Sequence, residues 1–325
     1  MAAEGRNREM SESSKNNGNT GGSKKNGFAL FHVFNAVPSL YKGIFCIVMA
    51  AFWFSLMNLF VRLSGDVPSM QKSFFRNFVA FLFALVIMKR QHIGFSGKKE
   101  NLPGLFFRSL FGTIGILCNF YAVDHMVLSD ASLLNKMSPF FAILASMVLL
   151  KEKVKPVQLL IVICAFLGSL FIIKPTAAIL ESGASLIGLF GGLCAGLAYT
   201  YVRVLGLRGE KGPFIVCFFS AFSCLCVLPN LILNYHPMTM VQLLFLLAAG
   251  LAAAGGQFSI TAAYCYAPAR EISVYDYSQI LFSALFGFWF LGQIPDVWSV
   301  VGYVIICSMA VAMFFYNNRK AAGDR

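Results

Sequence analysis

The sequence predicts an all-α integral membrane protein, with ten transmembrane helices arranged as two inverted five-helix repeats. Of the 325 residues, 58% are hydrophobic and only 12% are charged, which is far from the composition of soluble domains. Ten apolar stretches are each long enough to cross a hydrocarbon core of about 30 Å at about 1.5 Å per helical residue. The second five resemble the first five at one constant offset. Because five is odd, the two halves must have opposite orientations in the bilayer.

The apolar stretches follow one another with short connections. The predicted spans cover residues 43–63, 70–88, 103–123, 129–150, 156–173, 185–204, 213–233, 241–264, 272–291 and 297–316. We therefore expect the first repeat at residues 43–174 and the second at residues 185–317. Residues 1–42 precede the repeats. The first 27 of them are rich in Ser, Asn, Gly and Lys, which predicts a disordered cytoplasmic tail, and Phe28–Leu40 is apolar but too short to span, which suggests an interfacial segment.

An offset of 141 residues relates the two halves and serves three separate pairs of spans. Among the identities at this offset are Arg62 with Arg203, Gly115 with Gly256, and Phe141 with Phe282. Many secondary transporters use inverted repeats to form two alternately exposed gates around a midplane site, because one half can adopt the conformation of the other. Transport by alternating access is therefore the leading hypothesis.

The net charge of +12 is distributed among the loops in a way that indicates membrane topology and not a nucleic-acid partner. Most Lys and Arg residues fall before the first span, in alternate loops on the same side, and after the last span. In this count Arg108 belongs to the loop that precedes the third span. The loops predicted for the opposite side hold only Arg62 and Lys174. By the positive-inside rule, we expect both termini on the cytoplasmic side of the cell membrane.

The cysteines and histidines form no recognisable metal or redox motif. The nine Cys are scattered with no CxxC pair, and the four His lie in loops or near helix ends. We therefore expect no metal site and no cofactor. A membrane-embedded enzyme would need clustered acids, His or Ser at the membrane surface, and the short loops contain no such cluster, so we do not expect an enzyme.

A small set of charged and strongly polar residues falls inside the predicted spans. Each costs on the order of 2.5–3.5 kcal/mol near the bilayer centre, so each is a functional candidate. Lys72 and Arg76 open the second span, Asn135 and Lys136 lie in the fourth, and Asp276 lies in the ninth. At the repeat offset Asn135 falls on Asp276, which predicts similar depths reached from opposite sides.

Lys136 and Asp276 can reach one polar cavity, and three interpretations of them are open. In the first, they bind substrate and coupling ion, with Lys136 meeting an anionic group and Asp276 a cationic group. In the second they form a structural ion pair, and in the third Lys136 extends its long side chain to the outer interface. Burial of Asp276 favours its protonated form, so that a proton can bind and leave near neutral pH. Asp276 and Glu271 are therefore candidates for proton coupling, and permanent pairing of Asp276 is the alternative.

Further polar and aromatic residues lie at depths where they can line the same cavity. Tyr275 and Gln279 are one turn apart and share a helix face. Ser138-Pro139 interrupts the fourth span, since a proline removes one backbone hydrogen bond and kinks a helix. The candidate substrate-binding residues are Lys136, Asp276, Tyr275, Tyr277, Gln279, Trp53, Asn135, Tyr199 and Gln257.

The order of these features resembles the drug/metabolite transporter superfamily, and within it the family built from two EamA domains. The fourth span carries Ala131-x-Leu133 and Ser138-Pro139-Phe140-Phe141 and ends in Leu149-Leu150-Lys151-Glu152. The second repeat carries Tyr277-Ser278-Gln279, Gly287, Phe290-Leu291-Gly292 and Pro295-Asp296. The sequence departs from the family pattern at Gln293, where a helix-terminal Glu is usual, and at Ser278-Gln279, where a proline-containing motif is usual.

This resemblance implies a carrier for a small polar metabolite, such as an amino acid, a nucleoside-like compound or a cofactor-related compound. The expected partners are that small-molecule metabolite and the lipid bilayer, with a homodimer left open as the assembly. A membrane-embedded enzyme and a non-transporting receptor or scaffold are the alternatives. The inverted repeat disfavours the receptor, because sensing does not need two equivalent gates.

Overall fold

Helices account for every regular element in the residues that the computed structural model describes, which are 37–95, 97–125, 133–174, 183–292 and 294–323. Most of them are long α-helices, and two are short 3₁₀ segments. In chain order they are α3 (Ser39–Leu63), α4 (Ser69–Arg90), η1 (Lys99–Asn101), α5 (Leu102–His125), α7 (Ser138–Leu149), α8 (Pro156–Ile173), α9 (Gly183–Leu207), α10 (Gly212–Leu233), α11 (Met240–Tyr266), α12 (Ala269–Ile272), η3 (Ser273–Tyr277), α13 (Ser278–Leu291) and α14 (Val297–Gly323).

Eight of the described helices are long and apolar enough to cross a membrane. They are α3, α4, α5, α8, α9, α10, α11 and α14, and they coincide with eight of the ten predicted spans. Helix α3 begins at Ser39, earlier than the predicted residue 43, because Pro38 precedes it in a non-helical conformation and marks the helix start. The disordered tail predicted for residues 1–27, and most of the interfacial segment Phe28–Leu40, lie outside the described residues.

The fourth and ninth predicted spans, 129–150 and 272–291, are broken helices. The sequence predicts an interruption of the fourth span at Ser138-Pro139, whereas the break in the ninth corrects the expectation of a continuous helix. In the fourth, a turn at Lys136 and Met137 precedes α7. Pro139 lies in the first turn of α7, where its missing N–H removes no intrahelical hydrogen bond. The ninth begins as the short α12, continues as the 3₁₀ segment η3, and becomes α-helical again in α13.

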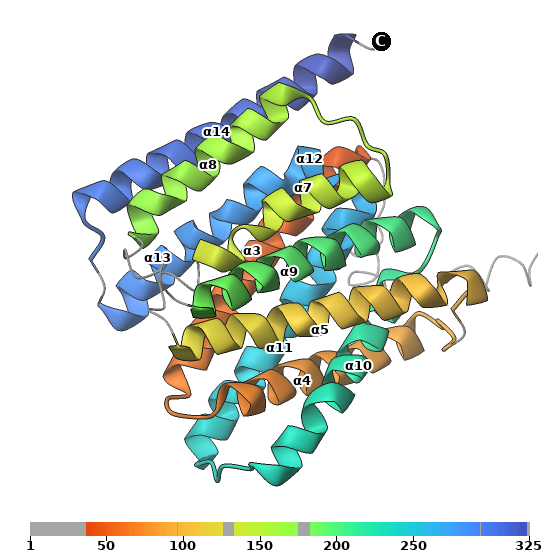
Figure 1. Cartoon of the computed structure of the whole chain (residues 1–325), viewed down its shortest axis with the longest axis vertical. Helices are drawn as coiled ribbons and strands as arrows, with labels where there is room; N and C mark the ends of the chain where they lie inside the picture. Colours follow the sequence, from red (N-terminus) through yellow and green to blue (C-terminus); the bar gives the residue numbers. More distant parts are fainter. Residues whose placement is uncertain (1–36, 96, 126–132, 175–182, 293, 324–325) are drawn as a thin grey trace, which may run out of the picture.

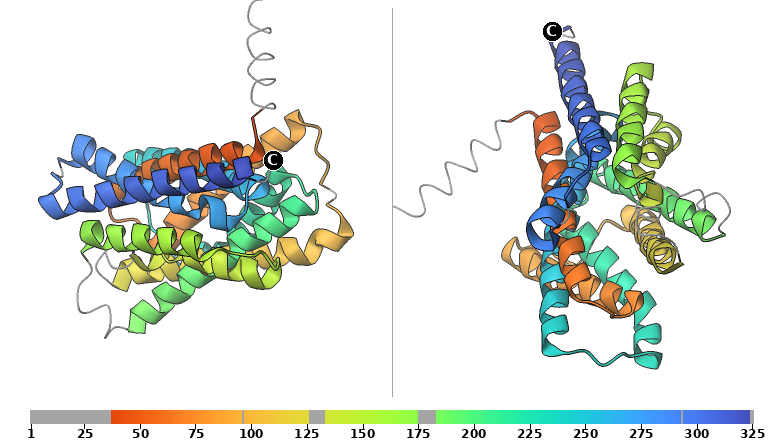
Figure 2. Two further views of the ribbon diagram at one scale, coloured as in Figure 1. Left: turned by 90° about the horizontal axis from the view of Figure 1, so that it is seen from above. Right: turned by 90° about the vertical axis from the view of Figure 1, so that its left-hand side faces the viewer.

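The helices pack in pairs that join segments far apart in the sequence. Helix α3 lies against α11, α5 against α9, and α4 against α10. Helices α8 and α14 lie side by side along one edge of the bundle (Figure 1). The second view of Figure 2 shows this edge at the side of the molecule away from α10. The broken helices lie between the α8–α14 edge and the remaining helices, because α12 and η3 contact α3, α7 and α8.

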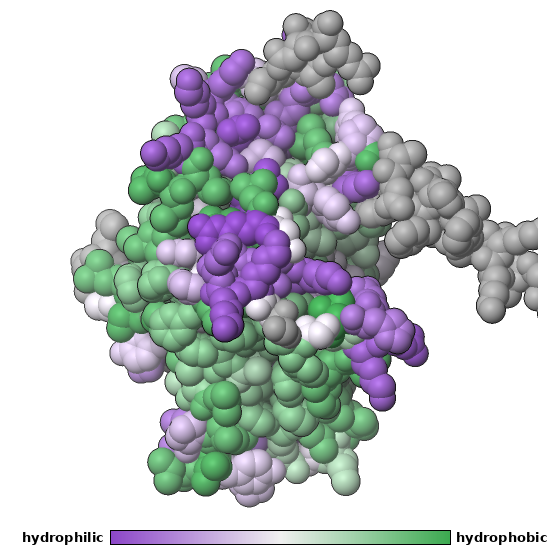
Figure 3. Space-filling model, turned by 90° about the vertical axis from the view of Figure 1, so that its right-hand side faces the viewer, coloured by the Kyte–Doolittle hydropathy of each residue, from purple (hydrophilic) through white to green (hydrophobic). Residues whose placement is uncertain are grey.

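The start of α3 and the end of α14 lie at the same end of the bundle (Figure 1), which we call the terminal end, as distinct from the opposite end. Figure 3 looks onto the terminal end and shows hydrophilic side chains gathered over its upper and middle parts, whereas its lower part is largely hydrophobic. Along the helices, by contrast, large apolar side chains are exposed, such as Val148 at 78%, Leu186 at 72% and Ile232 at 71%. Exposed apolar side chains on this scale mark a surface that lipid covers.

Helix α9 approaches α7 very closely at Gly196. A Cβ atom at this position would lie 2.6 Å from Cβ of Phe141 and 2.7 Å from the backbone nitrogen of Ala142. We expect Gly196→Val to lower the free energy of unfolding in detergent by about 1–3 kcal/mol, because α7 must shift as a whole to make room. Gly183→Val in the same helix is the matched control, since a Cβ at Gly183 meets nothing within 4 Å. Equal losses in the two variants would contradict the packing argument.

Candidate functional site

The two broken helices meet at an ion pair between Lys136 and Asp276. Nζ of Lys136 lies 3.1 Å from Oδ2 of Asp276 and donates to the amide oxygen of Gln279 at 2.6 Å. Each charged side chain is only 11% exposed. The structure therefore brings these two candidates into direct contact, and Lys136 points into the bundle and not to an interface.

The breaks in the two helices supply the backbone geometry around this pair. The carbonyl oxygen of Lys136, which the turn before α7 releases from the helix, accepts a hydrogen bond from the hydroxyl of Tyr277 at 3.1 Å. The carbonyl oxygen of Gln279 accepts one from the hydroxyl of Ser55 on α3 at 2.8 Å. Irregular backbone is tolerated at membrane depth only where protein groups or a polar cavity satisfy it. The neighbouring helices therefore hold the two breaks in place.

The two tyrosines of η3 are both buried beside the ion pair. Tyr277 is 0% exposed and its hydroxyl is used by the Lys136 carbonyl. Tyr275 is 7% exposed, and its hydroxyl has no hydrogen-bond partner among the described residues. A buried hydroxyl without a partner is costly, so Tyr275 has a polar atom available for a bound molecule.

Two further candidates are interior residues of α9 and α11. The ring of Tyr199 stacks on that of Tyr264 with centroids 5.1 Å apart, and Tyr199 lies close enough to Asp276 for an electrostatic interaction. Gln257 on α11 is 6% exposed and accepts a hydrogen bond from Arg108 at 3.3 Å. These residues therefore extend the polar interior beyond the pair itself.

The remaining substrate-binding candidates contact other helices more than the ion pair. The amide of Asn135 donates to the side-chain oxygen of Asn119 on α5 at 2.8 Å. The indole of Trp53 packs against α11, where a Cβ at Gly255 would lie 2.7 Å from it. Both residues hold neighbouring helices together in this structure.

The two candidates for proton coupling lie in different places. Asp276 is in the centre of the bundle, whereas Glu271 lies in α12 near the terminal end, with Oε1 3.6 Å from Nε of Arg270. Arg270 also lies 3.9 Å from Glu152, and Arg203 lies 3.8 Å from the other oxygen of Glu152. This cluster joins the loop after α7 to α9 and α12 at the terminal end.

Two arginines of the interior do not appear among the predicted site residues. Arg108 is not a loop residue, which corrects its assignment to the loop before the third span: it lies within α5 and is 2% exposed. Arg76 on α4, one of the costly residues of the predicted spans, is 8% exposed. The sequence signal for Arg108 was its position inside the predicted span 103–123. That position is better evidence for its location than its inclusion in the count of loop charges.

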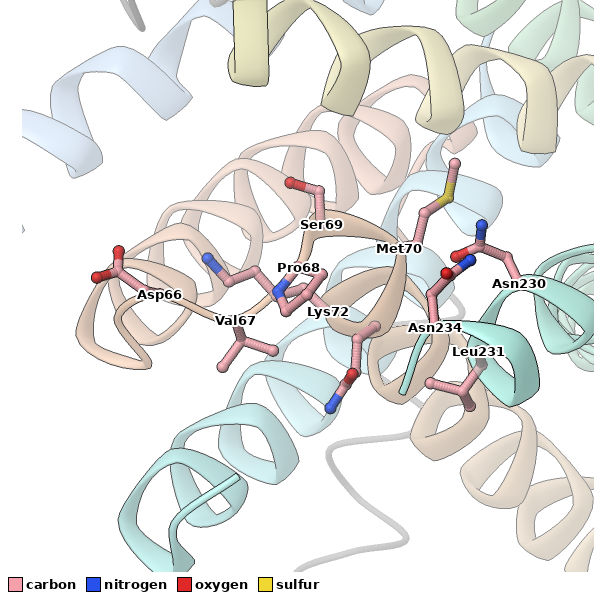
Figure 4. A pocket seen from close by; sticks show the side chains of 10 residues that line it. Asp66, Val67, Pro68, Ser69, Met70, Lys72, Asn230, Leu231 and Asn234 are labelled. Carbon is pink, nitrogen blue, oxygen red and sulfur yellow. The ribbon is translucent and has the colours of Figure 1, made fainter. Parts of the chain in front are cut away.

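A pocket of about 390 Å³ opens at the opposite end of the bundle (Figure 4). It is lined by the loop between α3 and α4, including Asp66, by the first turn of α4, including Lys72, and by the end of α10, including Asn230 and Asn234. Beside it, the side chain of Gln71 exchanges two hydrogen bonds with the backbone of His236, at 2.9 and 3.0 Å. Polar groups therefore surround this opening.

A second link at the opposite end joins Lys174, after α8, to Asp296, before α14. Hydrogen bonds from Lys174 and Ser299 lower the pKa of Asp296 to about 2. Its lowered pKa keeps Asp296 charged throughout the physiological range, so it cannot serve as a proton carrier there.

A bundle of membrane-spanning helices with two broken helices around a buried charge pair defines a multi-pass membrane carrier. Among the described residues, no group of three or more His, Cys, Asp or Glu is arranged to hold a metal ion. The EamA-like transporter family matches residues 41–174. The chain belongs to that family and is a membrane transporter, not an enzyme.

The chain is similar to transporters from several organisms. It is 31% identical over 276 residues to the Pseudopaline exporter CntI of Pseudomonas aeruginosa, covering 84% of this chain and 96% of that protein. It is 25% identical over 282 residues to the Riboflavin transporter of Rhizobium johnstonii, covering 85% of this chain and 91% of that protein. A solved crystal structure shares the fold with a TM-score of 0.72 at 15% identity, over 84% of this chain and 98% of the other.

Removing one member of the Lys136–Asp276 pair leaves the other buried and uncompensated. We expect Lys136→Met and Asp276→Asn each to lower the free energy of unfolding by about 3–5 kcal/mol, and the double variant to lose clearly less than the sum. Thermal or denaturant unfolding of the purified wild type, the two single variants and the double variant measures this double-mutant cycle. The exposed pair Lys174–Asp296 is the control, because its side chains are 49% and 45% exposed and surface pairs contribute about 0–1 kcal/mol. Additive losses at Lys136 and Asp276 would contradict a coupled pair.

Proposed function

We propose that this protein is a secondary transporter that moves a small polar metabolite across the cell membrane by alternating access. The observation that carries the proposal is the Lys136–Asp276 pair, which is 11% exposed and lies where two broken helices meet. Broken helices at the midplane of an inverted-repeat carrier present backbone and charged groups to a substrate. The substrate separates the pair, Lys136 meets an anionic group, and Asp276 meets a cationic group or a proton.

The helix bounds support an inverted repeat with the offset seen in the sequence. Helix α8 begins at Pro156 and α14 at Val297, which differ by that offset, and α7 and α13 begin at Ser138 and Ser278, within one residue of it. The first repeat then comprises residues 43–174 and the second residues 185–317. Exchange of the halves maps α3 with α11 onto α9 with α5, and both of these pairs pack together.

The centre of the bundle supports the same relationship between the halves. Lys136 and Tyr277 are equivalent positions, and the Tyr277 hydroxyl donates to the Lys136 carbonyl. Equivalent residues of two symmetry-related halves can touch only near the axis that relates them. The substrate site on this axis is therefore equally reachable from either side when the two halves exchange conformations.

The two ends of the bundle differ in a way that suits one state of such a cycle. At the terminal end, Glu152 of the first half faces Arg203 and Arg270 of the second. At the opposite end, the 390 Å³ pocket opens between the start of α4 and the end of α10. We assign this arrangement to a state closed at the terminal end. By the positive-inside rule, we infer a cytoplasmic location for the terminal end and for both termini.

The proposed substrate is a metabolite that uses hydrogen bonds as well as charge. Tyr275 offers a buried hydroxyl without a partner among the described residues, and Gln279, Tyr199 and Gln257 add polar atoms around the pair. The relatives named as exporter of pseudopaline and transporter of riboflavin support a solute of similar polarity, and an amino acid or a nucleoside-like or cofactor-related compound fits the site.

Ligand-induced thermal stabilisation tests the proposal. The purified chain is screened with amino acids, nucleosides and vitamins, and compounds that raise its unfolding temperature go into liposome flux assays. A ligand that binds only the native state stabilises by about 2.7 kcal/mol at a hundredfold excess over its Kd. We expect at least one compound to stabilise the wild type but neither Lys136→Ala nor Asp276→Asn. Variants that fold and keep the full response would show that the pair is only structural.

We expect the pH gradient to drive transport through Asp276 and not through Glu271, because Asp276 lies centrally and Glu271 is held near Arg270. In proteoliposomes, Asp276→Asn should abolish accumulation driven by an imposed pH gradient, and Asp276→Glu should restore most of it. Glu271→Gln should leave accumulation within about twofold, less than about 0.4 kcal/mol. Loss of coupling in Glu271→Gln with retention in Asp276→Asn would reverse the assignment.

A further inference from the structure

Two arginines are buried in the bundle and have no carboxylate partner in the part of the chain that the structure describes. Arg76 on α4 is 8% exposed and Arg108 on α5 is 2% exposed. Among the described residues, neither takes part in an ion pair. The two guanidinium groups lie within electrostatic range of each other and of the Tyr199 hydroxyl. They therefore form one cluster of positive charge, which we call the arginine pair.

The contacts of the arginine pair leave donors unused. Arg108 donates to the amide oxygen of Gln257 at 3.3 Å and lies 3.8 Å above the centroid of the Phe219 ring. Its Nε has no hydrogen-bond partner among the described residues, and the same holds for Nε of Arg76. A guanidinium carries five donors in a planar fork. The observed contacts account for only a small part of the capacity of the pair.

Helix α5 is shaped to hold the Arg108 guanidinium in this position. One turn after Arg108 the chain has Gly112, where a Cβ atom would clash with Nη1 of Arg108 and lie 2.8 Å from the Phe219 ring. The guanidinium therefore lies between its own helix and the ring of Phe219 on α10. Its remaining donors are oriented by packing and do not depend on a flexible side chain.

The nearby carboxylate does not neutralise this charge. Asp276 interacts electrostatically with Tyr199, as the arginine pair does, but Asp276 is already bound to Lys136 at 3.1 Å. Buried charges without compensation are costly, because protein interiors replace little of the hydration that is lost. An anion between the two guanidinium groups would supply both the missing charge and acceptors for the unused donors.

Arg76 lies on the helix that lines the opening at the opposite end. Lys72 lines the 390 Å³ pocket there, and Arg76 is four residues further along α4, which places it about 6 Å deeper on the same helix face. A series of basic side chains thus leads from the pocket toward the interior. Such a series raises the local concentration of anions and guides them inward.

We propose that Arg76 and Arg108 bind a carboxylate or phosphate group of an organic anion that is the transported substrate. This inference rests on the proposed function, since it specifies the charge of the solute that the Lys136–Asp276 site transports. Planar guanidinium groups match carboxylate and phosphate oxygens in bidentate geometry. The substrate therefore carries a negative group at the arginine pair in addition to the group that meets Lys136.

Binding of defined anions to the full chain in a neutral detergent tests this inference. The probes are succinate, citrate and glycerol phosphate, with dimethyl succinate as the uncharged counterpart and phosphatidylglycerol as the lipid source of the same phosphate chemistry. We expect at least one soluble anion, but not the ester, to raise the unfolding temperature. Arg76→Gln and Arg108→Gln should weaken its apparent affinity about tenfold or more, the loss of one charged hydrogen bond. The matched control is Arg90→Gln on the exposed end of α4.

The unfolding temperature without ligand separates a binding role from a structural one. Removal of an uncompensated buried charge should leave it unchanged or raise it, so a lower value in both variants would overturn the inference. Retained anion affinity in the variants, no response of the wild type to any soluble anion, or a response to phosphatidylglycerol alone would also overturn it.

The same experiments distinguish this inference from the proposed function. A neutral metabolite that stabilises the wild type and the arginine variants equally, and is transported in liposomes through Lys136, would leave the proposed function intact and refute the anion site. An anion bound at the arginine pair without any flux of that anion would support the site and refute transport of that solute.

Discussion

The rest of this structure depends on one constraint, the free-energy cost of burying charged side chains in an interior that solvates them poorly. Lys136 and Asp276 are acceptable in the interior because they lie 3.1 Å apart and Gln279 supplies a further acceptor. The contact requires both supporting helices to be broken at the same depth, since the breaks bring η3 and the turn before α7 together. The break before α7 releases the carbonyl of Lys136, which the Tyr277 hydroxyl satisfies, and Ser55 bonds the carbonyl of Gln279 in the first turn of α13. Pairing, helix breaks and hydroxyl contacts thus depend on one another.

Polar groups at the terminal end of the bundle join the two halves of the fold, whereas polar groups in the middle are available to bind a solute. At the terminal end, the oxygens of Glu152 have cations on two sides, Arg203 and Arg270, and the contacts join segments from both halves. In the middle, several polar atoms have no partner among the described residues, including the Tyr275 hydroxyl and Nε of two arginines. Oε2 of Glu152 and Nε of Arg203 also have no hydrogen-bond partner among the described residues, so the terminal end is held by charge–charge contacts between the two halves. Unused donors and acceptors in a protected interior are available to a ligand.

The relatives show which of these features belong to the fold. A solved structure that is 15% identical still superposes with a TM-score of 0.72, so the arrangement of helices tolerates replacement of most side chains. Apolar residues on lipid-facing and helix-facing surfaces substitute for one another at little cost when size is kept. Charged residues in the interior do not, because each needs a specific partner. The arrangement of helices therefore does not by itself identify the solute.

The sequence by itself determined the membrane class, eight of the ten spans and the residues of the central pair, because apolar length and buried charge are local properties that a bilayer makes costly to violate. It also predicted an interruption at Ser138-Pro139, but the break lies just before it, at Lys136 and Met137, and Pro139 in the first turn of α7 removes no intrahelical hydrogen bond. The break before α13 has no proline, and only packing against α3 and α7 reveals it. The tertiary structure alone decided that the Arg108 guanidinium stacks on Phe219 and that the Tyr275 hydroxyl has no partner among the described residues, because side-chain contacts depend on which helices become neighbours.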